Sequence, residues 1–526
     1  MSETPPGWSR VPLRELTLPG SSFNPGNLEA ETFQYIDIEA LDNARQVIDK
    51  PKELAVSQAP SRARVLVRSG DVLFSLVRPY LKNVALISSD LDGQIASTAF
   101  CCVRPGPGID SRFVFNQLCQ DRLILSIPTY GSSPPAARDE EFFDTPVMLA
   151  PENEQRRIVA KIEELFSELD AGTTALERVK ANLARFKVSV LKAAVEGRLT
   201  ENWREEHPDV ESASVLLERI LKERRKKWEE EQLAKYEAKG KKLPTAWREK
   251  YQEPTKPDIG GLPALPAGWW WASVGQVSAI QGGIQKQPNR APKRNAYPYL
   301  RVANVLMNRL DLQEIEYFEL LPGELERLRL ETGDLLVVEG NGSRDQIGRS
   351  ALWVGQIADC VHQNHIIRVR PRGIEPRYLN SYWNSPVARR RTTEVAASTS
   401  GLYTLSVGKV SSLPVPVPPL AEQTMIADTV EEQLDSIDQT LSECLAALVR
   451  AGKMRFGILR SAFEGRLVPQ DPSDEPATVL LDRIRAERAA DAKTRPARKA
   501  RGSRKPSGVD KGHKLVPLPF ETLDPK

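Results

Sequence analysis

Hydrophobic residues recur at alternating steps of three and four along two long segments of the chain. This spacing is typical of a helix with one seam facing a partner helix. In the first segment the positions are Ile158, Ile162, Leu165, Leu169, Leu176, Leu183, Phe186 and Val190. In the second they are Ile426, Val430, Ile437, Leu441, Cys444, Leu448, Met454 and Ile458. Helices of about 45 residues would span about 70 Å, more than a small domain, so the pattern favours pairing of the two helices over packing of each on its own domain.

The two helical segments are copies of each other. Residues 151–199 align without a gap on residues 419–467, at an offset of 268, with about 13 of 49 positions identical. A shorter copy follows each of them, at 215–220 and at 479–484. Such a repeat indicates that one structural unit occurs twice.

The segments that precede the helices have the composition of short strands. Residues 63–67, 97–103 and 334–338 are β-branched runs bounded by Gly, Pro and Asp. Gly70-Asp71-Val-Leu in the first segment corresponds to Gly333-Asp334-Leu-Leu in the second. The predicted fold class is α+β, with two mixed α/β domains joined by a pair of long antiparallel coiled-coil helices in a pseudo-two-fold internal repeat.

Two segments outside this repeat are highly charged. Residues 201–261 hold a charged helix around Trp228 and then a Pro-punctuated linker, which fits either a solvated helix or a docking surface for another protein. The stretch from Asp491 to Lys514 is basic and poor in hydrophobic residues. We expect it to be disordered, and nonspecific contact with nucleic acid remains open.

Composition narrows the class of protein. The chain has 526 residues, 27% charged and 40% hydrophobic, with a net charge of only +3, so its bulk charge favours neither nucleic acid nor membrane. The five cysteines are scattered and form no CxxC pair, as is usual in a reducing compartment. No apolar run reaches the ~18 residues that cross a bilayer, and the N-terminus lacks a signal-peptide core. We therefore expect a cytoplasmic protein without a membrane partner.

Motifs for catalysis are absent from the sequence. There is no phosphate-binding GxxxxGK[ST] loop and no Asn/Asp-Pro-Pro-aromatic motif of adenine methyltransferases. His362 and His365 lie near Cys360, but on a strand the two histidines would point to opposite faces, which argues against a metal site. We expect no metal, no cofactor and no catalysis in this chain alone.

The order of the sequence motifs along this chain resembles that of the specificity subunits of type I restriction–modification systems. The resemblance rests on the Gly-Asp phrases, on Glu154-Gln155 and Glu422-Gln423 at the helix starts, and on Glu-Gly-Arg-Leu at each helix end. It implies a non-catalytic subunit whose two variable domains each read one half of a split, asymmetric target in double-stranded DNA. It also implies two methyltransferase subunits and motor/nuclease restriction subunits as partners, which would carry S-adenosylmethionine, ATP and Mg.

The resemblance also suggests where the domains begin and end. We expect a first target-recognition domain (1–150), a first spacer helix (151–200), a charged helix and linker (201–261), a second target-recognition domain (262–418), a second spacer helix (419–490) and a basic tail (491–526).

Polar residues on Gly- or Pro-flanked loops are the candidates for reading bases, because Arg pairs with guanine and Asn or Gln with adenine. In the first domain they are Arg78, Tyr80, Lys82, Tyr130 and Ser132. In the second domain they are Asn341, Ser343, Arg344, Asp345, Gln346, His362, Gln363, Asn364, Ser400 and Tyr403. Each of them could equally be an exposed loop residue without a ligand.

Charge differs between the two predicted domains. Residues 262–418 carry 18 basic and 13 acidic side chains, whereas residues 1–150 carry 14 and 18, so the first domain needs a local basic face and help from partner subunits. The phosphate candidates in the second domain are Arg294, Arg301, Arg368, Arg370, Arg389, Arg390 and Arg391. Two other hypotheses stay open at this point: a coiled-coil scaffold with two protein-binding domains, and a fused enzyme with an unrecognised active site.

Overall fold

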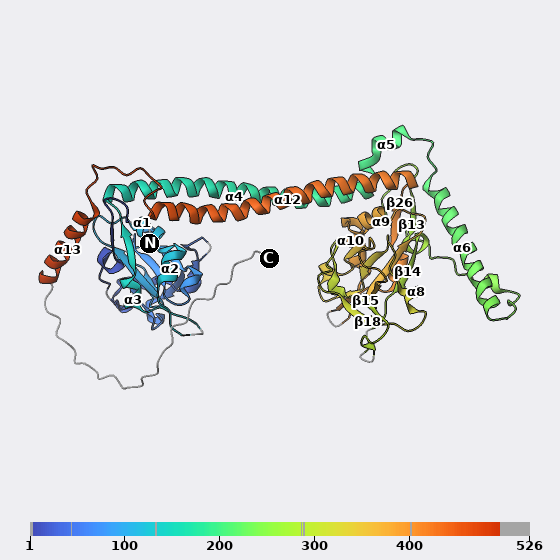
Figure 1. Ribbon diagram of the computed structural model, residues 1–526, viewed down its shortest axis with the longest axis horizontal. Helices are drawn as coiled ribbons and strands as arrows, with labels where there is room; N and C mark the ends of the chain where they lie inside the picture. Colours follow the sequence, from blue (N-terminus) through green and yellow to red (C-terminus); the bar gives the residue numbers. More distant parts are fainter. Residues whose placement is uncertain are drawn as a thin grey trace. The chain divides into compact units, whose positions relative to one another are not determined.

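The computed structural model describes residues 4–20, 22–43, 45–131, 134–285, 287, 290–399 and 402–494. The chain folds as two compact units, the first made of residues 1–176 and 446–526 and the second of residues 177–445. Two helices of 44 residues, α4 (Glu152–Val195) and α12 (Leu420–Phe463), contribute to both units. Each unit also holds its own sheets (Figure 1), so the α+β class expected from the sequence is confirmed.

Twelve described strands form the sheets of the first unit. They are β1 (Ser9–Pro12), β2 (Thr17–Leu18), β3 (Thr32–Ile36), β4 (Leu41–Asp42), β5 (Val47–Ile48), β6 (Lys52–Ala55), β7 (Ala63–Leu66), β8 (Val72–Ser75), β9 (Val84–Leu86), β10 (Ile95–Ser97), β11 (Phe100–Pro105) and β12 (Pro146–Leu149). The strand orders are β6-β3-β10-β7, β2-β11-β8-β9, β1-β12 and β4-β5. Three helices lie between β11 and β12: α1 (Ser111–Leu118), α2 (Asp121–Ser126) and α3 (Asp139–Asp144).

Aromatic side chains join these sheets and helices into one core. Phe74 of β8 stacks on Phe142 of α3, with 4.6 Å between ring centroids. Phe113 of α1 lies 5.1 Å from Phe463, near the end of α12. All four rings are buried, and burial of one such side chain is worth about 1.5–3 kcal/mol. The end of α12 therefore completes the core of the domain at the beginning of the chain.

The second unit repeats this plan with different strands. They are β13 (Trp270–Ser273), β14 (Ser278–Gly282), β15 (Ala296–Leu300), β16 (Val305–Leu306), β17 (Arg309–Leu310), β18 (Glu316–Glu319), β19 (Leu335–Val338), β20 (Gly340–Asn341), β21 (Ser350–Leu352), β22 (Val361–His362), β23 (Ile366–Pro371), β24 (Ala397–Thr399), β25 (Leu402–Thr404) and β26 (Pro414–Val417). Their orders are β13-β26, β14-β23-β19-β21, β18-β15-β22, β16-β17 and β20-β25-β24. The helices are α5 (Glu201–Glu206), α6 (Ala213–Ala238), α7 (Val274–Val277), α8 (Glu324–Leu328), α9 (Pro376–Trp383), α10 (Pro386–Val395) and α11 (Val407–Ser412).

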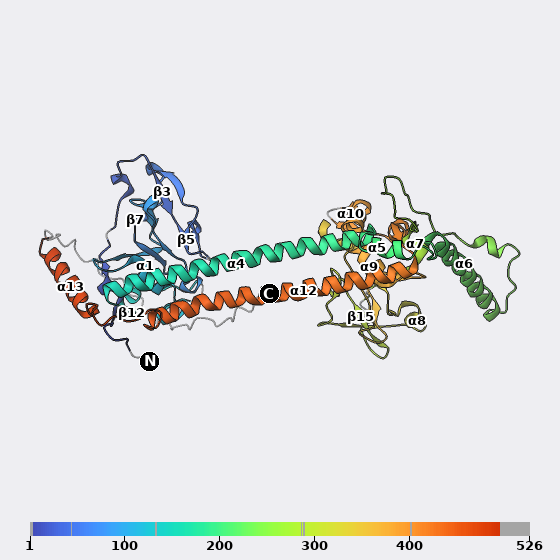
Figure 2. The ribbon, with the colours of Figure 1, turned by 90° about the horizontal axis from the view of Figure 1, so that it is seen from above.

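In each unit α4 and α12 run side by side in opposite directions, as Figures 1 and 2 show. The same ion pair joins the two helices in both units. Arg455 is 2.5 Å from Asp170 in the first unit, and Lys187 is 2.9 Å from Asp438 in the second. The two aspartates occupy one repeat position and the two basic residues another, so the copies pair reciprocally in the same register.

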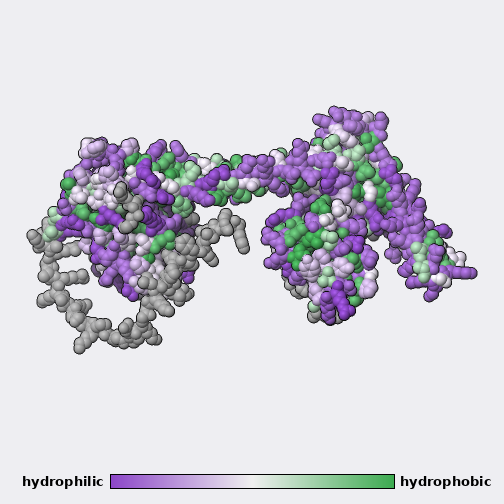
Figure 3. Space-filling view, viewed as in Figure 1, coloured by the Kyte–Doolittle hydropathy of each residue, from purple (hydrophilic) through white to green (hydrophobic). Residues whose placement is uncertain are grey.

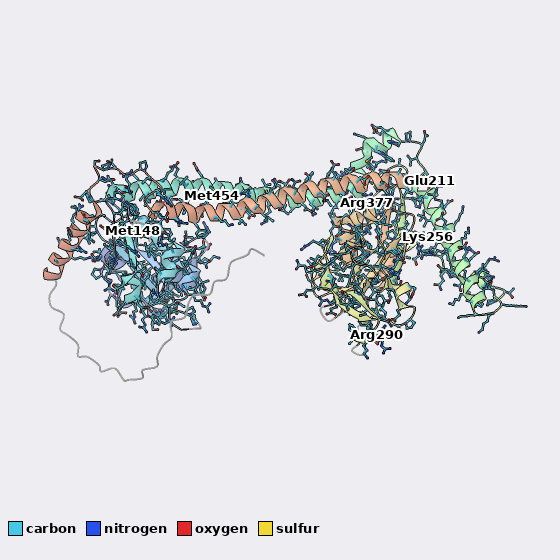
Figure 4. The ribbon with its side chains drawn as sticks, in the orientation of Figure 1. Met148, Glu211, Lys256, Arg290, Arg377 and Met454 are labelled. Carbon is cyan, nitrogen blue, oxygen red and sulfur yellow. The ribbon has the colours of Figure 1, made fainter. Side chains whose placement is uncertain are left out.

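The seam between the helices differs from the sequence prediction at one repeat position. Phe186 and Met454, which we expected in the seam, are 53% and 57% exposed. The neighbouring Lys187 and Arg455 lie in the seam instead, because each forms the ion pair with the opposite helix. Arg455 also covers the ring of Phe166, at 4.5 Å from its centroid. Met454 is labelled on α12 in Figure 4.

A shorter helix follows each long helix and packs on the sheets of the same unit. Helix α6 belongs to the second unit, and α13 (Ala477–Thr494) belongs to the first. The backbone N–H of Ala213 donates to the Gly268 oxygen, and that of Ala477 donates to the Gly7 oxygen, both at 2.8 Å. Their first turns bury equivalent residues: Ala213, Leu216, Leu217, Ile220, and Ala477, Leu480, Leu481, Ile484. The second, shorter copy seen in the sequence is thus a helix that docks in the same way twice.

Candidate DNA-recognition surface

The repeated Gly-Asp phrases form a buried ion pair that holds two strands together. Asp71 accepts hydrogen bonds from Arg104 at 2.8 and 2.6 Å, and Asp334 accepts them from Arg370 at 2.6 and 2.8 Å. Both carboxylates are buried at the start of a strand, and the glycine before each has a φ of 87° or 95°. Only glycine adopts such a φ readily, so the phrase makes a turn and then an anchor.

The Glu-Gln phrases at the helix starts attach each long helix to its domain. The indole N–H of Trp8 donates to Glu154, and that of Trp269 donates to Glu422, each at 2.9 Å. Burial raises the pKa of Glu154 above the ordinary value. The following glutamines accept from backbone N–H groups at 2.9 and 2.8 Å, in the pairs Asp110 with Gln155 and Glu375 with Gln423. These buried contacts therefore position each domain on its long helix.

Each unit brings two equivalent loops together. The backbone N–H of Ala137 donates to the Leu76 oxygen at 2.9 Å, and that of Leu405 donates to the Glu339 oxygen at 2.7 Å. Leu76 follows β8 and Glu339 follows β19, and these strands carry the equivalent Gly-Asp phrases. The backbone is therefore repeated while the loop side chains differ, which is the arrangement expected of two modules that read different ligands.

In the second unit, the two loops form a three-stranded sheet. Asn341 in β20 lies opposite Tyr403 in β25, and β25 pairs with β24. Arg344 and Gln346 lie in a short 3₁₀ helix directly after β20, and Ser343, Arg344 and Gln346 are all exposed. The sequence candidates at 341–346 and at 403 are thus neighbours, although about 60 residues separate them. Ser400 and the side chains of Asn341 and Asp345 lie outside the described residues.

Helix α10 adds an arginine-lined cavity beside this loop. The cavity has a volume of about 390 Å³ and is lined by Arg344, Arg389, Arg390, Thr393 and Glu394. Arg389 donates to the Ile347 oxygen at 2.7 Å, which fixes the loop against the helix. The side chain of Arg390 is 83% exposed and forms an ion pair with Glu394 on the same helix at 2.8 Å. Three guanidinium groups around one opening are suited to phosphate oxygens or to the acceptor edge of guanine.

One glycine and one tryptophan hold the loop close to the helices. Gly348 has a φ of 64°, and a side chain there would approach Thr392 of α10 to 2.3 Å. The indole N–H of the buried Trp383 donates to the Gly348 oxygen at 2.9 Å. The loop that carries Arg344 is therefore supported by α9 and α10, a role that the sequence alone did not indicate.

His362 lies inside the protein. It is 0% exposed, its Nδ1 is 3.0 Å from the Ile366 oxygen, and its Nε2 has no hydrogen-bond partner within the described part of the chain. Burial lowers the pKa of His362 to about 4, so the ring is neutral at physiological pH. His362 is consequently not part of the surface proposed below. On a strand that is buried on both faces, a polar residue is not necessarily exposed to solvent.

The neighbouring candidates Gln363 and Asn364 are half-buried in the turn after β22. The side-chain oxygen of Gln363 accepts from the Val302 N–H at 3.4 Å, so this residue supports the turn. His365, which the sequence analysis weighed only as a metal ligand, is exposed, and its Nδ1 is 3.6 Å from a Glu339 carboxylate oxygen. That contact places His365 beside the backbone of the candidate loop.

The candidates of the first unit also gather, through the segment at 134–138. The Arg78 N–H donates to the Pro135 oxygen at 2.9 Å, and Tyr130 pairs with Ala136 through its backbone. Arg78 has no side-chain ion pair in the described structure, and Tyr80 is 39% exposed. Ser132 lies outside the described residues. The geometry thus brings the loop at 78–82 next to Tyr130, as in the second unit.

Two of these candidates are already engaged within the first unit. The ammonium of Lys82 is 2.6 Å from Asp121 and 4.4 Å from the centroid of the Phe456 ring. The hydroxyl of Tyr130 donates to Glu141 at 2.5 Å, and this contact raises the pKa of Tyr130. A ligand at either side chain would have to compete with these contacts, so Arg78 and Tyr80 are the freer pair.

Several arginines considered for phosphate binding have structural roles instead. Arg368 is 6% exposed and donates to the Arg329 oxygen at 2.9 Å, and Arg370 is held by Asp334. Arg301 is 3.1 Å from Glu316. The sequence could not distinguish these from surface arginines, because their partners come from distant strands.

Two absences hold for the described ranges. No group of three or more His, Cys, Asp or Glu side chains is placed to hold a metal ion there. No helix among them combines the length and the apolar composition needed to span a membrane.

Comparison with known proteins assigns the family. No family model matches the chain. The EcoKI specificity subunit of Escherichia coli K12 is 27% identical over 415 residues, which are 76% of this chain and 77% of that protein. The EcoBI specificity subunit of Escherichia coli is 25% identical over 376 residues, which are 68% of this chain and 67% of that protein.

Solved structures share the same fold. The HsdS subunit of Thermoanaerobacter tengcongensis is 25% identical, with a TM-score of 0.56 over 88% of this chain and 98% of that one. A chain in a structure of type I R-M complex assembly and conformational transition has a TM-score of 0.64 at 24% identity, over 88% of this chain and 99% of that one. The fold and the paired loops thus define a two-module recognition protein. The chain belongs to the specificity subunits of type I restriction enzymes, which are the non-catalytic recognition subunits of these systems.

Proposed function

We propose that this chain is the DNA sequence-specificity subunit of a type I restriction–modification complex and binds a bipartite, asymmetric target. The observation that carries the proposal is the repeated frame, which presents different polar loops in the two units. In the first unit the readers are Arg78 and Tyr80, with Lys82 and Tyr130 beside them. In the second they are Ser343, Arg344, Gln346 and Tyr403, and Asn341, Asp345, Gln363 and Asn364 are further candidates. Each good bidentate pair with a base contributes about 1–3 kcal/mol of discrimination.

The domain boundaries expected from the sequence accompany this proposal. Residues 1–150 and 262–418 would be the two recognition domains, and 151–200 and 419–490 the spacer helices that set the unread gap. Dimeric DNA readers place two half-sites at a fixed distance through their symmetry, and the internal repeat would do so within one polypeptide.

The partners we propose are two methyltransferase subunits, with motor/nuclease subunits joining the complex. The exposed apolar residues of the long helices support two copies of one partner, because they occur at equivalent repeat positions. Phe186 and Val188 are 53% and 52% exposed on α4, and Met454 and Phe456 are 57% and 49% exposed on α12. Phe456 also lines a cavity of about 470 Å³ in the first unit. S-adenosylmethionine, ATP and Mg would belong to the partners, and the complex would act in the cytoplasm.

A methylome tests the proposal. The chain is co-expressed with a type I methyltransferase subunit encoded beside it, in a host without adenine methylation, and N6-methyladenine is mapped by single-molecule sequencing. We expect one split, asymmetric motif with a constant gap. A complex that is intact, supplied with S-adenosylmethionine and still methylates nothing would contradict the proposal and favour a scaffold.

A further inference from the structure

A basic arm extends from the second unit and has no role in the recognition surface described above. It consists of residues 222–256, which are most of α6 and the chain that returns from its end. The buried residues of α6 are confined to its first two turns, 213–220, so the remainder leaves the sheets. Figure 1 shows α6 running away from the unit, on the opposite side of its sheets from α10.

Aromatic rings fasten the returning chain to the helix. Trp247 stacks on Trp228 with 5.8 Å between ring centroids, and Tyr251 lies 5.3 Å from Trp228. Trp247 is only 8% exposed, although it lies on the arm. Arg224 adds hydrogen bonds to the Gly275 and Ser278 oxygens, at 2.8 and 3.0 Å, which anchor the base of the arm to the sheets. A helix exposed to solvent on all sides would not need these contacts. They hold the returning chain against α6 and fix the shape of the arm.

The charge on the arm is uneven. Two of its acidic residues pair with basic residues of the arm: Glu229 with Arg225 and Arg248, and Glu230 with Lys226. The tip, residues 232–250, carries six basic side chains and two acidic ones. Its excess of four exceeds the net charge of the whole chain, which is +3.

The tip charges are exposed lysines: Lys235, Lys239, Lys241, Lys242 and Lys250. None of the five has an ion pair within the described residues, and three of them surround the turn at Gly240. Figure 3 shows the surface of the arm as mainly hydrophilic. Lysine is a point charge on a flexible stem, which suits phosphate oxygens and does not select bases.

We infer that the tip of the arm binds the phosphate backbone of duplex DNA that flanks the second half-site. This inference rests on the proposed function, because it places the flank beside the half-site read by the loop of Arg344. The arm and α10 lie on opposite sides of the same sheets, so the arm is separate from the surface at α10. It adds affinity that depends on salt and not on sequence. An acidic protein surface is the other ligand that such a tip would fit.

The test compares duplexes that contain the methylome motif and differ only in their flanks. One extends far beyond the second half-site, one extends equally far beyond the first, and a third has no flank. Binding by the complex of this chain with its methyltransferase is measured by fluorescence anisotropy across a salt series. The variant carries Lys235→Gln, Lys239→Gln, Lys241→Gln and Lys242→Gln, all at exposed positions that leave the fold intact.

We expect the variant to lose affinity only for the duplex with the second flank. The slope of log affinity against log salt should fall by about 0.9 for each lysine that contacts a phosphate. A control with arginine at the same four positions should retain the slope, and the first-flank and flankless duplexes should bind both proteins equally.

The outcomes distinguish a failure of the inference about the arm from a failure of the proposed function. An unchanged slope on the second-flank duplex, with specific binding intact, overturns the arm inference and leaves the proposed function standing. Weaker assembly of the variant with its partner subunits, at an unchanged slope, assigns the arm to a protein and also overturns the inference. Loss of sequence-specific binding by the unaltered complex would instead contradict the proposed function itself.

Discussion

At the scale of single residues, Arg344 is the side chain from which base discrimination is expected. It is exposed on a loop that Gly348, Trp383 and Arg389 hold in place, and it lines the cavity beside α10. We expect Arg344→Ala to relax the second half-site by about 1–3 kcal/mol at one position and to leave the first half-site unchanged. The measurement is the methylated motif of the variant. A changed preference in the first half would contradict the assignment of Arg344 to the second.

His362 predicts a dependence of stability on pH. Its pKa is about 4 in the folded chain and 6.5 in the reference state, so the unfolded chain binds the proton more readily. Stability from this residue is present above pH 6.5 and is lost as the pH falls toward 4, by about 2 kcal/mol at pH 5. Denaturant unfolding at pH 7.5 and 5 should therefore show a smaller loss for His362→Gln than for the unaltered chain. Equal losses would show that the ring is protonated in the fold.

Sequence reasoning found the loops but could not assign every residue on them. Arg344 and Tyr403 were predicted separately, and the structure makes them parts of adjacent loops. His362 was predicted as a surface group because a polar residue in a short strand does not reveal that both faces of the strand are buried. Arg368 was predicted as one because its partner, the Arg329 oxygen, lies far away in the sequence. The supporting contacts of Gly348 and Trp383 escaped notice for the same reason, since a packing contact over 35 residues leaves no local pattern.

At the scale of elements, the repeated sequence motifs make structural contacts that join strands to strands and helices to domains. The Gly-Asp and Glu-Gln phrases each make the same buried contacts twice, so they identify the fold and not the ligand. The helical seam was predicted well except where Lys187 and Arg455 replace Phe186 and Met454. Alternating steps of three and four residues are compatible with either of two adjacent residues in the seam. The ion pair with an aspartate on the opposite helix places Lys187 and Arg455 there.

The exposed apolar pairs on the two long helices predict the stoichiometry of assembly. We expect Phe186→Ser with Val188→Ser to remove one of two bound methyltransferase subunits, because each pair would form one docking site. Met454→Ser with Phe456→Ser should remove the other, and native mass spectrometry would show the loss of one subunit in each case. Far-UV circular dichroism controls for folding. If either variant still bound two subunits, the helices would not be the docking sites.

At the scale of the whole molecule, the proposed ruler can be lengthened. Inserting one heptad after Leu176 and one after Cys444 keeps the seam in phase, because seven residues are one full repeat. Each helix grows by about 10 Å, which is about three base pairs of DNA. We expect a methylated motif whose gap is longer by about three base pairs, with both half-sites unchanged. The original gap in this variant would contradict the ruler.

The docking of α6 and α13 has a consequence for shortened versions of the chain. The first half of the chain supplies one domain, one long helix and one trailing helix, and the second half supplies the same three parts. Residues that meet across the two halves, such as Asp170 with Arg455 and Lys187 with Asp438, have equivalents within each half. A shortened chain ending after α6 would therefore be able to complete its fold with a second copy of itself, and such a homodimer would present the same recognition loop twice, as a palindromic site requires.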